Sequence, residues 1–396
     1  MGSSRAALRF LTVSVLGATT FLARAARTEP AADGAAETQA AAVAKKPDPA
    51  ADGWPDMSSF LDEKFGFLPV VMPITEPAVG YGAAGGLAFL SKPFGAAAQG
   101  LGRPSITFVG GFGTENGSWG AAAMDMRYWA DDRVQTIAAA IYASVNLDFH
   151  GVGKDSVFED HPIRYNLNPK GGMANVRYRF GDTRLWAGVG YMFARIDVTA
   201  EAPEDLERLP DYESAANIGG LTLAGTWDTR NNFFTATRGV YVEASFTPYG
   251  EWLGGDDNFE KLAITTIQYA PLPHRLYLGV RDDIQAAFGD APFYMKPYIS
   301  LRGVPVMRYQ GDETASLEAE LRWQFYGRWS LLGFGGGGVA WNDFGWGNDT
   351  STVFSGGGGF RYELARAYGI HMGVDVAFSR DTAAFYIQVG SAWMRP

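Results

Sequence analysis

Apolar and polar residues alternate along most of this chain, which is the period-two pattern of a β-strand with two chemically different faces. The clearest run covers residues 314–326, in which Leu317 and Trp323 share an apolar face. The opposite face of this run carries Glu318 and Glu320. Such a strand meets an apolar phase on one side and polar groups on the other.

About sixteen segments of this kind follow one another over residues 65–394. Many reach the ~9–11 residues that a tilted strand needs to cross a bilayer. Short turns such as 181–183 and 326–328 alternate with long loops such as 201–215 and 288–313, which is typical of bacterial outer-membrane barrels. The alternative is a secreted soluble β-sandwich, with shorter strands and its apolar face turned inward. We expect an all-β fold, a transmembrane antiparallel β-barrel of about 16 strands.

The two ends of this array carry further expectations. The first predicted strand, 65–74, contains Pro69 and Pro73, which lack backbone donors. We therefore expect weak pairing between the first strand and the last. In the last predicted strand, 383–394, the alternation continues to Trp393, which is expected on the outward apolar face.

The N-terminal region reads as export and linker sequence. Residues 1–25 have a basic start, a short apolar stretch and the small-x-small exit Ala23-Arg24-Ala25, as in a secretory signal peptide. A signal anchor is the alternative, although the stretch is short for a membrane span. Residues 26–56 are rich in Ala, Pro and charge without a period, so we expect a disordered linker. The barrel is predicted over 57–396.

Composition limits the chemistry that the chain can perform. The net charge of -10 argues against nucleic acid as a partner. The absence of cysteine removes disulfides, thiolate metal sites and cysteine nucleophiles. The four histidines lack metal-ligand spacing, and only His371 shares a predicted polar face with an acid, Asp375. We expect no cofactor and no metal, and the lack of a catalytic constellation argues against an enzyme.

Three short motifs occur in a fixed order. Trp227–Asn232 continues to Thr237-Arg238-Gly239, Leu301-Arg302-Gly303-Val304 lies in the longest loop, and Ser316-Leu317-Glu318 opens the next strand. Together they resemble the BamA/TamA-type superfamily of outer-membrane barrels, the bacterial surface antigen family. The matching family features are its DTRDN…PTRG periplasmic turn, its (V/I)RG(F/Y) motif in extracellular loop six and its SLE strand. Five predicted strands follow the loop, as in the family's sixteen-strand order.

The resemblance implies a role for the loop motif. Arg302 and Gly303 would belong to a loop six that folds back into the lumen. Arg302 would form a charge-assisted pair there with Glu318, or with Glu320 or Asp375. The residues alone leave open an arginine on a solvated loop.

The other motif implies a structural lock. Asp228, Arg230, Arg238 and Gly239 match the family's periplasmic turn, where Asp and Arg are expected to tie two strand ends together.

A glycine-rich strand is expected to form a groove for the loop. Phe334, Gly336 and Gly338 fall on one face, and the missing side chains leave space there. A glycine-rich turn or bulge is the alternative. The sequence departs from the family here, because Gly336 stands where the family has the Asp that receives the loop arginine, and Val304 replaces the usual aromatic. Glu318 is therefore expected to be the main partner of Arg302.

The resemblance also implies a function and a location. No POTRA repeats precede the barrel, so we expect a barrel-only member in the bacterial outer membrane, surrounded by outer-membrane lipid. It would insert or transport client outer-membrane polypeptides through a lateral seam between the first and last strands. A passive pore or a structural surface protein is the alternative function.

Overall fold

The computed structural model describes residues 52–59, 68–90, 105–150, 162–200, 212–342 and 350–394. The predicted signal peptide and most of the predicted linker lie outside the described residues. The predicted division into signal peptide, linker and barrel stays a prediction.

Sixteen antiparallel strands form one sheet in which each strand pairs with its neighbours in the sequence. Their bounds are β1 Leu68–Ile74, β2 Gly82–Leu90, β3 Ile106–Thr114, β4 Trp119–Trp129, β5 Val134–Phe149, β6 Ile163–Arg179, β7 Leu185–Ala200, β8 Tyr212–Asp228, β9 Gly239–Tyr249, β10 Phe259–Leu272, β11 Leu276–Gly289, β12 Glu313–Tyr326, β13 Trp329–Trp341, β14 Ser351–Ala365, β15 Ile370–Ser379 and β16 Ala383–Val389. Within the described residues, short 3-10 turns lie between strands at η2 Glu251–Leu253, η3 Pro273–Arg275, η4 Phe293–Met295 and η5 Arg366–Tyr368.

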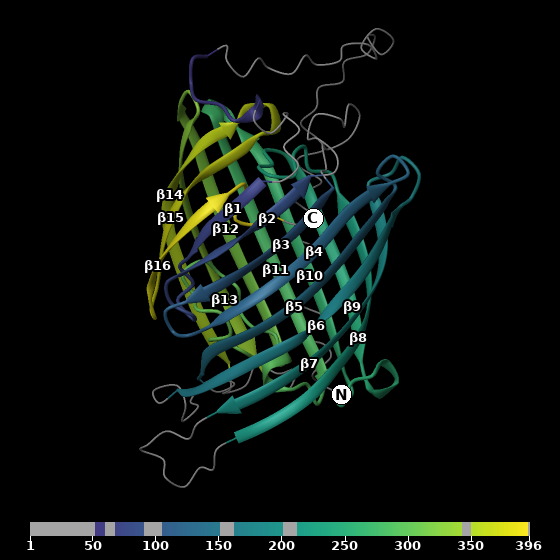
Figure 1. Ribbon diagram of the computed structural model, residues 1–396. Coiled ribbons are helices and arrows are strands. Elements are labelled where there is room, and N and C mark those ends of the chain that lie inside the picture. The colour runs from purple at the N-terminus through teal and green to yellow at the C-terminus, as the bar shows by residue number, and fades with distance from the viewer. Residues whose placement is uncertain are drawn as a thin grey trace, which may run out of the picture.

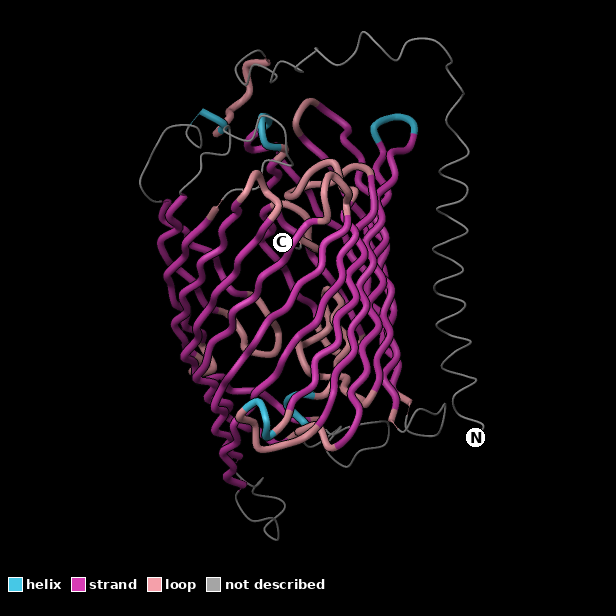
Figure 2. The backbone as a smooth tube through the Cα atoms, turned by 90° about the vertical axis from the view of Figure 1, so that its right-hand side faces the viewer, coloured by secondary structure: helices cyan, strands magenta, loops and turns pink. Residues whose placement is uncertain are grey.

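The sheet curls into a nearly closed barrel, so that the last strands come round to lie beside the first (Figure 1). The strands cross the wall obliquely, with connections gathered at the two ends (Figure 2). The predicted all-β barrel of sixteen strands is confirmed. In the part of the chain that the structure describes, no helix is long and apolar enough to cross a membrane.

The two faces of the sheet differ as the alternation predicts. On β12, the side chains of Leu317 and Trp323 are 49% and 47% exposed, whereas Glu318 and Arg322 are 1% and 6% exposed. The exposed face is therefore apolar and the buried face is charged. A soluble β-sandwich has the opposite distribution, so the outward side of this sheet suits a lipid environment. We call the opposite side the inner face.

The last strand departs from the prediction. β16 ends at Val389, and Gly390 takes a left-handed conformation with φ 81° that an alternating pattern does not reveal. Beyond it the chain turns toward the inner face, where Trp393 is 4% exposed and packs with Tyr241 and Ile267. The expected outward position of Trp393 was wrong for this reason.

The first and last strands meet at an edge that we call the seam. β1 and β16 have seven residues each, against seventeen in β6. Among the described strands, the backbone ladder begins at β1 and ends at β16, with no register between these two. The Thr75 hydroxyl donates to the Phe385 carbonyl oxygen, and the Tyr81 and Phe385 rings stack with centroids 6.0 Å apart. Side chains rather than a ladder therefore make the contacts across the seam.

We call one end of the barrel the short-turn rim. It carries turns 130–133, 180–184, 327–328 and 366–369, because every second connection of an antiparallel meander falls at the same end. In outer-membrane barrels the short turns face the periplasm.

Candidate functional site

The structure brings the guanidinium of Arg302, from the loop between β11 and β12, together with three carboxylates. Its Nε donates to Glu318 at 2.6 Å, and its Nη1 lies 2.8 Å from Glu320 and 2.9 Å from Asp375. The Arg302 side chain is 7% exposed, and those of Glu318 and Asp375 are 1% and 0% exposed. Buried charges of this kind must be paired, because removing one member leaves the others uncompensated in a poorly solvated site.

The register of the sheet explains how Glu318 reaches this position. Glu318 on β12 stands directly opposite Gly336 on β13. A Cβ on Gly336 would lie 3.2 Å from the Cβ of Glu318. The carboxylate that the family places at the Gly336 position is thus supplied from the neighbouring strand, and the glycine leaves room for it.

Asp375 on β15 is shared between two arginines. Arg361 on β14 donates to its two carboxylate oxygens at 2.5 and 2.8 Å, while Arg302 approaches one of them from the loop. Asp375 pairs with Gly359 in the register, and a Cβ on Gly359 would collide with the Asp375 carboxylate. Two arginines and three carboxylates therefore form one network across β12, β14, β15 and the loop.

The guanidinium of Arg302 packs against the face of an aromatic ring. The Arg302 guanidinium carbon lies 3.6 Å from the centroid of the Phe334 ring, which is a close cation–π contact. A Cβ on Gly357 would lie 2.7 Å from the Phe334 ring, so that glycine makes space for the aromatic. At Gly338 the space left by the missing side chain is occupied by Ile299 of the loop. These contacts agree with a groove on this strand.

Gly303 needs to be glycine for two reasons. Its φ is 82°, a left-handed value that costs little only for glycine. A Cβ there would lie 2.9 Å from that of Ala377. The backbone N–H of Gly303 donates to the Tyr386 hydroxyl at 2.9 Å, which joins the loop to β16. The prediction that the whole loop occupies the lumen stays a prediction.

Sequence reasoning missed four members of this site. Arg361, Tyr386, Gly357 and Gly359 were not singled out, although the glycine run 356–359 was a signal. Alternate residues of a strand share one face, so the spacing of Gly357, Gly359 and Arg361 would have placed all three on the same face of their strand. His371 is buried, but its ring nitrogen lies 3.2 Å from the Gly369 carbonyl oxygen, so its hydrogen bond is with the turn.

The predicted lock at the turn between β8 and β9 contains a buried ion pair. The Arg230 Nε and Nη2 each lie 3.0 Å from a different oxygen of the Asp228 carboxylate. Both side chains are at most 4% exposed. The guanidinium also stacks 4.5 Å above the Tyr241 ring.

The rest of this turn is held by backbone groups. Arg238 joins through its main chain, since its N–H donates to the Asn231 side-chain oxygen at 3.1 Å and its carbonyl accepts from the Asn231 N–H at 3.2 Å. Gly239 has φ 105°, and a Cβ there would collide with the Thr229 carbonyl oxygen. The four predicted turn residues are thus brought together, two by charge and two by backbone geometry.

A barrel with an exposed apolar exterior and a buried arginine network on its inner face is an outer-membrane β-barrel. The Omp85 superfamily domain matches residues 113–343, which is more than half of the chain, and the chain belongs to that superfamily. It is therefore a protein of the bacterial outer membrane, as predicted. No curated protein matches the chain.

Solved structures show the same fold at low sequence identity. BamA from Haemophilus ducreyi lacking POTRA domains 1–3 has a TM-score of 0.56 and 12% identity, covering 82% of this chain and 70% of that one. CdiB from Escherichia coli has a TM-score of 0.54 and 11% identity, covering 81% and 62%. CdiB from Acinetobacter baumannii has a TM-score of 0.53 and 10% identity, covering 82% and 59%. The chain thus spans less than two thirds of the CdiB chains.

Proposed function

We propose that this protein inserts or transports polypeptides at the bacterial outer membrane, and that they pass through the seam between β1 and β16. The observation that carries the proposal is the structure of the seam. β1 and β16 have only seven residues each, and the described residues show side-chain contacts between them and no ladder of backbone hydrogen bonds. Pro69 and Pro73 lie four residues apart, so they withhold donors on the same edge of β1. Because the described strands show no ladder between β1 and β16, the seam is the place where the wall parts most easily.

The loop carrying Arg302 would act as a brace during such opening. Arg302 and Gly303 join it to β12, β15 and β16 through Glu318, Asp375 and Tyr386. These contacts lie on one side of the seam, so the loop would hold the last strands in place while β1 separates. The backbone N–H of Val306 donates at 3.2 Å to Glu76, which follows β1, and this hydrogen bond would be broken on opening.

A passive axial pore is the alternative function, and the residues near the barrel's C-terminus argue against it. Trp393 is buried on the inner face, and Ser391 lies 3.0 Å from the Tyr269 hydroxyl of β10. The C-terminal residues therefore extend to strands remote from β16, which supports a lateral route over an axial one. Omp85 barrels are assembly and transport proteins, and we propose that this chain likewise works without catalysis, with unfolded outer-membrane polypeptides as its clients. The described residues contain no group of three or more His, Asp or Glu side chains that could hold a metal.

Depletion in the native bacterium tests this function. We expect loss of the protein to lower the amounts of other proteins in the outer membrane, measured by quantitative proteomics of isolated envelopes. Wild-type protein should restore them, and the Arg302→Ala variant should restore them less than the Arg164→Ala variant, whose exposed ion pair is remote from the site. Unchanged outer-membrane protein levels together with ion conductance in planar bilayers would instead support the passive pore.

A further inference from the structure

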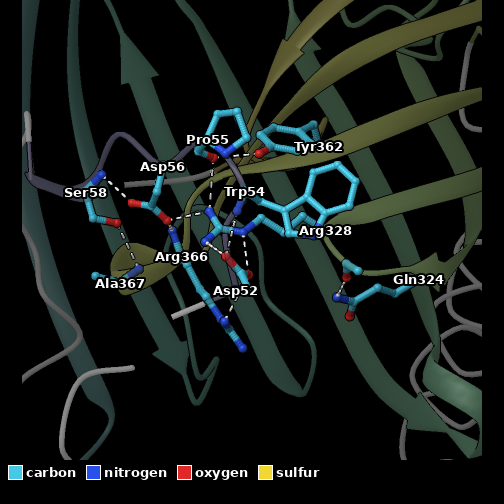
Figure 3. Close-up of polar contacts among 11 residues, drawn as sticks. Asp52, Trp54, Pro55, Asp56, Ser58, Gln324, Arg328, Tyr362, Arg366 and Ala367 are labelled. Atoms are coloured by element: carbon cyan, nitrogen blue, oxygen red, sulfur yellow. Dashed lines mark hydrogen bonds and ion pairs between the residues drawn. The ribbon is translucent and has the colours of Figure 1, made fainter. Parts of the chain in front are cut away.

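Residues 52–58 dock on the short-turn rim around one buried arginine, Arg328, in the turn between β12 and β13 (Figure 3). Two of its nitrogens donate to the Asp52 carboxylate at 2.8 Å each, and a third donates to Asp56 at 2.5 Å. The Arg328 side chain is 1% exposed. A bidentate guanidinium–carboxylate contact with a second acid is among the stronger polar arrangements in proteins.

Aromatic and backbone contacts surround this ion pair. The Trp54 ring lies edge-on to Tyr326, with centroids 5.8 Å apart. The Tyr362 hydroxyl donates to the Pro55 carbonyl oxygen at 2.6 Å. The Met57 N–H donates at 2.8 Å to the carbonyl oxygen of Leu364, near the end of β14.

Ser58 and Asp56 extend the contacts to η5. The Ser58 hydroxyl accepts from the Ala367 N–H at 3.1 Å, and Asp56 accepts from the Arg366 N–H at 3.2 Å. Composition predicted a disordered linker for 26–56. Residues 52–56 are held here by residues 272 to 314 positions further along the chain, where no local pattern reveals them, and the predicted linker stays a prediction.

The docking point lies on the opposite side of the seam from the strand that follows. Residues 52–58 contact β12 to η5, which belong to the last strands, while β1 begins at Leu68 on the other side of β16. Nine residues lie between Ser58 and Leu68, and the ten residue steps from one to the other span at most about 33–36 Å in an extended chain. The docked segment therefore limits how far β1 can move from β16 at this rim.

We propose that residues 52–58, held by Arg328, act as a strap: they anchor the chain that leads to β1 on the last strands, and so restrain lateral opening at the short-turn rim until they are released. This inference rests on the proposed opening of the seam. The ligand of the rim site is a peptide with two carboxylates flanking Trp-Pro, and the chain supplies it itself. When the segment leaves, Arg328 loses both carboxylates, and the contacts of Thr75, Glu76 and Tyr81 then oppose opening without the strap.

Docking can be measured directly because the chain has no native cysteine. In Met57→Cys/Leu364→Cys protein, a short bifunctional thiol reagent should join the two positions. Adding Arg328→Ala should lower the crosslinking rate about tenfold or more, since it removes several hydrogen bonds between charged groups. The matched control is Arg133→Ala, which alters an exposed ion pair at another turn of the same rim and should leave the rate unchanged. An unchanged rate with Arg328→Ala overturns the proposal.

A second readout tests the effect on the seam. In Thr75→Cys/Phe385→Cys protein, release of the strap by Arg328→Ala should slow crosslinking across the seam several-fold, because the two strands spend less time in contact. Asp52→Asn/Asp56→Asn should act in the same way, and it leaves the barrel sequence untouched if Arg328→Ala fails to fold. Loss of docking with a wild-type seam rate would overturn the strap. Failure of the proposed function gives a different result. Client assembly would then stay normal even with the seam fully crosslinked, whether or not the strap is docked.

Discussion

Removing the Arg302 guanidinium is expected to destabilise the barrel more than removing any one of its partners. Arg302→Ala leaves Glu318, Glu320 and Asp375 in one buried site, with Arg361 as the remaining cation bonded to Asp375. Breaking a buried pair in this way typically costs about 3–5 kcal/mol. That loss changes the unfolding equilibrium constant by roughly two to three and a half orders of magnitude.

Glu318→Ala should cost less, about 1–3 kcal/mol, because Arg302 keeps two other carboxylates. The double variant should be little worse than Arg302→Ala alone, since both single changes remove the same contact. The assay is urea unfolding of the refolded barrel in detergent micelles, followed by tryptophan fluorescence. Arg302→Lys should fall between wild type and Arg302→Ala, because an ammonium keeps the charge but not the planar fork of donors.

Arg164→Ala provides the control for this experiment. Arg164 lies 3.8 Å from Asp148, and the two side chains are 81% and 49% exposed. Exposed pairs of this kind contribute less than about 1 kcal/mol. An Arg302→Ala loss no larger than that of the control, or strictly additive losses for Arg302 and Glu318, would refute the buried network.

Gly359, Asp228 and Asp52 each allow a separate test. Gly359→Ala should cost about 1–3 kcal/mol in urea unfolding, because the new methyl collides with a buried carboxylate. The control is Gly335→Ala on the exposed face, where the nearest atom lies 3.7 Å from the added Cβ, and it should change stability by less than about 0.5 kcal/mol. Equal losses for the two variants would contradict the collision at Gly359. Asp228→Ala should cost about 3–5 kcal/mol by stranding a buried guanidinium, and a loss below about 1 kcal/mol would dismiss the turn lock. Hydrogen bonding to Arg328 lowers the pKa of Asp52 to about 2 from its ordinary 3.8. The contribution of Asp52 to docking is therefore full above pH 3.8 and is lost as the pH falls toward 2. A nitroxide on Met57→Cys should be immobile at pH 7 and mobile near pH 2, and equal mobility at both pH values would count against the ion pair.

The sequence was sufficient for the barrel because the period of two repeats in nearly every strand. Leu317 and Glu318 are adjacent in the sequence, yet one side chain is on the exposed face of the sheet and the other is on the buried face, as alternation predicts. The pattern failed at Gly390, where one left-handed residue ends the ladder and sends Trp393 inward. Backbone conformation at a single glycine is not encoded in hydrophobic periodicity.

The arginine site was predictable in part. The resemblance implied Glu318 as the main partner of Arg302, with Glu320 or Asp375 as alternatives, but Arg361 carries no motif and became visible only through its contact with Asp375. Gly359 illustrates a second limit, since its role depends on the register that sets it opposite Asp375. Register between strands requires the folded sheet, and composition alone gives only a glycine-rich run.

Passage of clients through the seam requires β1 and β16 to separate, so we would lock the seam reversibly. Thr75→Cys/Phe385→Cys protein, the only copy in the cell, would be joined by a reducible thiol crosslinker, and newly made outer-membrane proteins would be followed by pulse labelling. If clients pass through the seam, assembly of these proteins stops while the lock is in place and resumes on reduction, and neither single-cysteine variant responds. Normal assembly in cells whose seam is fully locked would show that clients do not pass between β1 and β16.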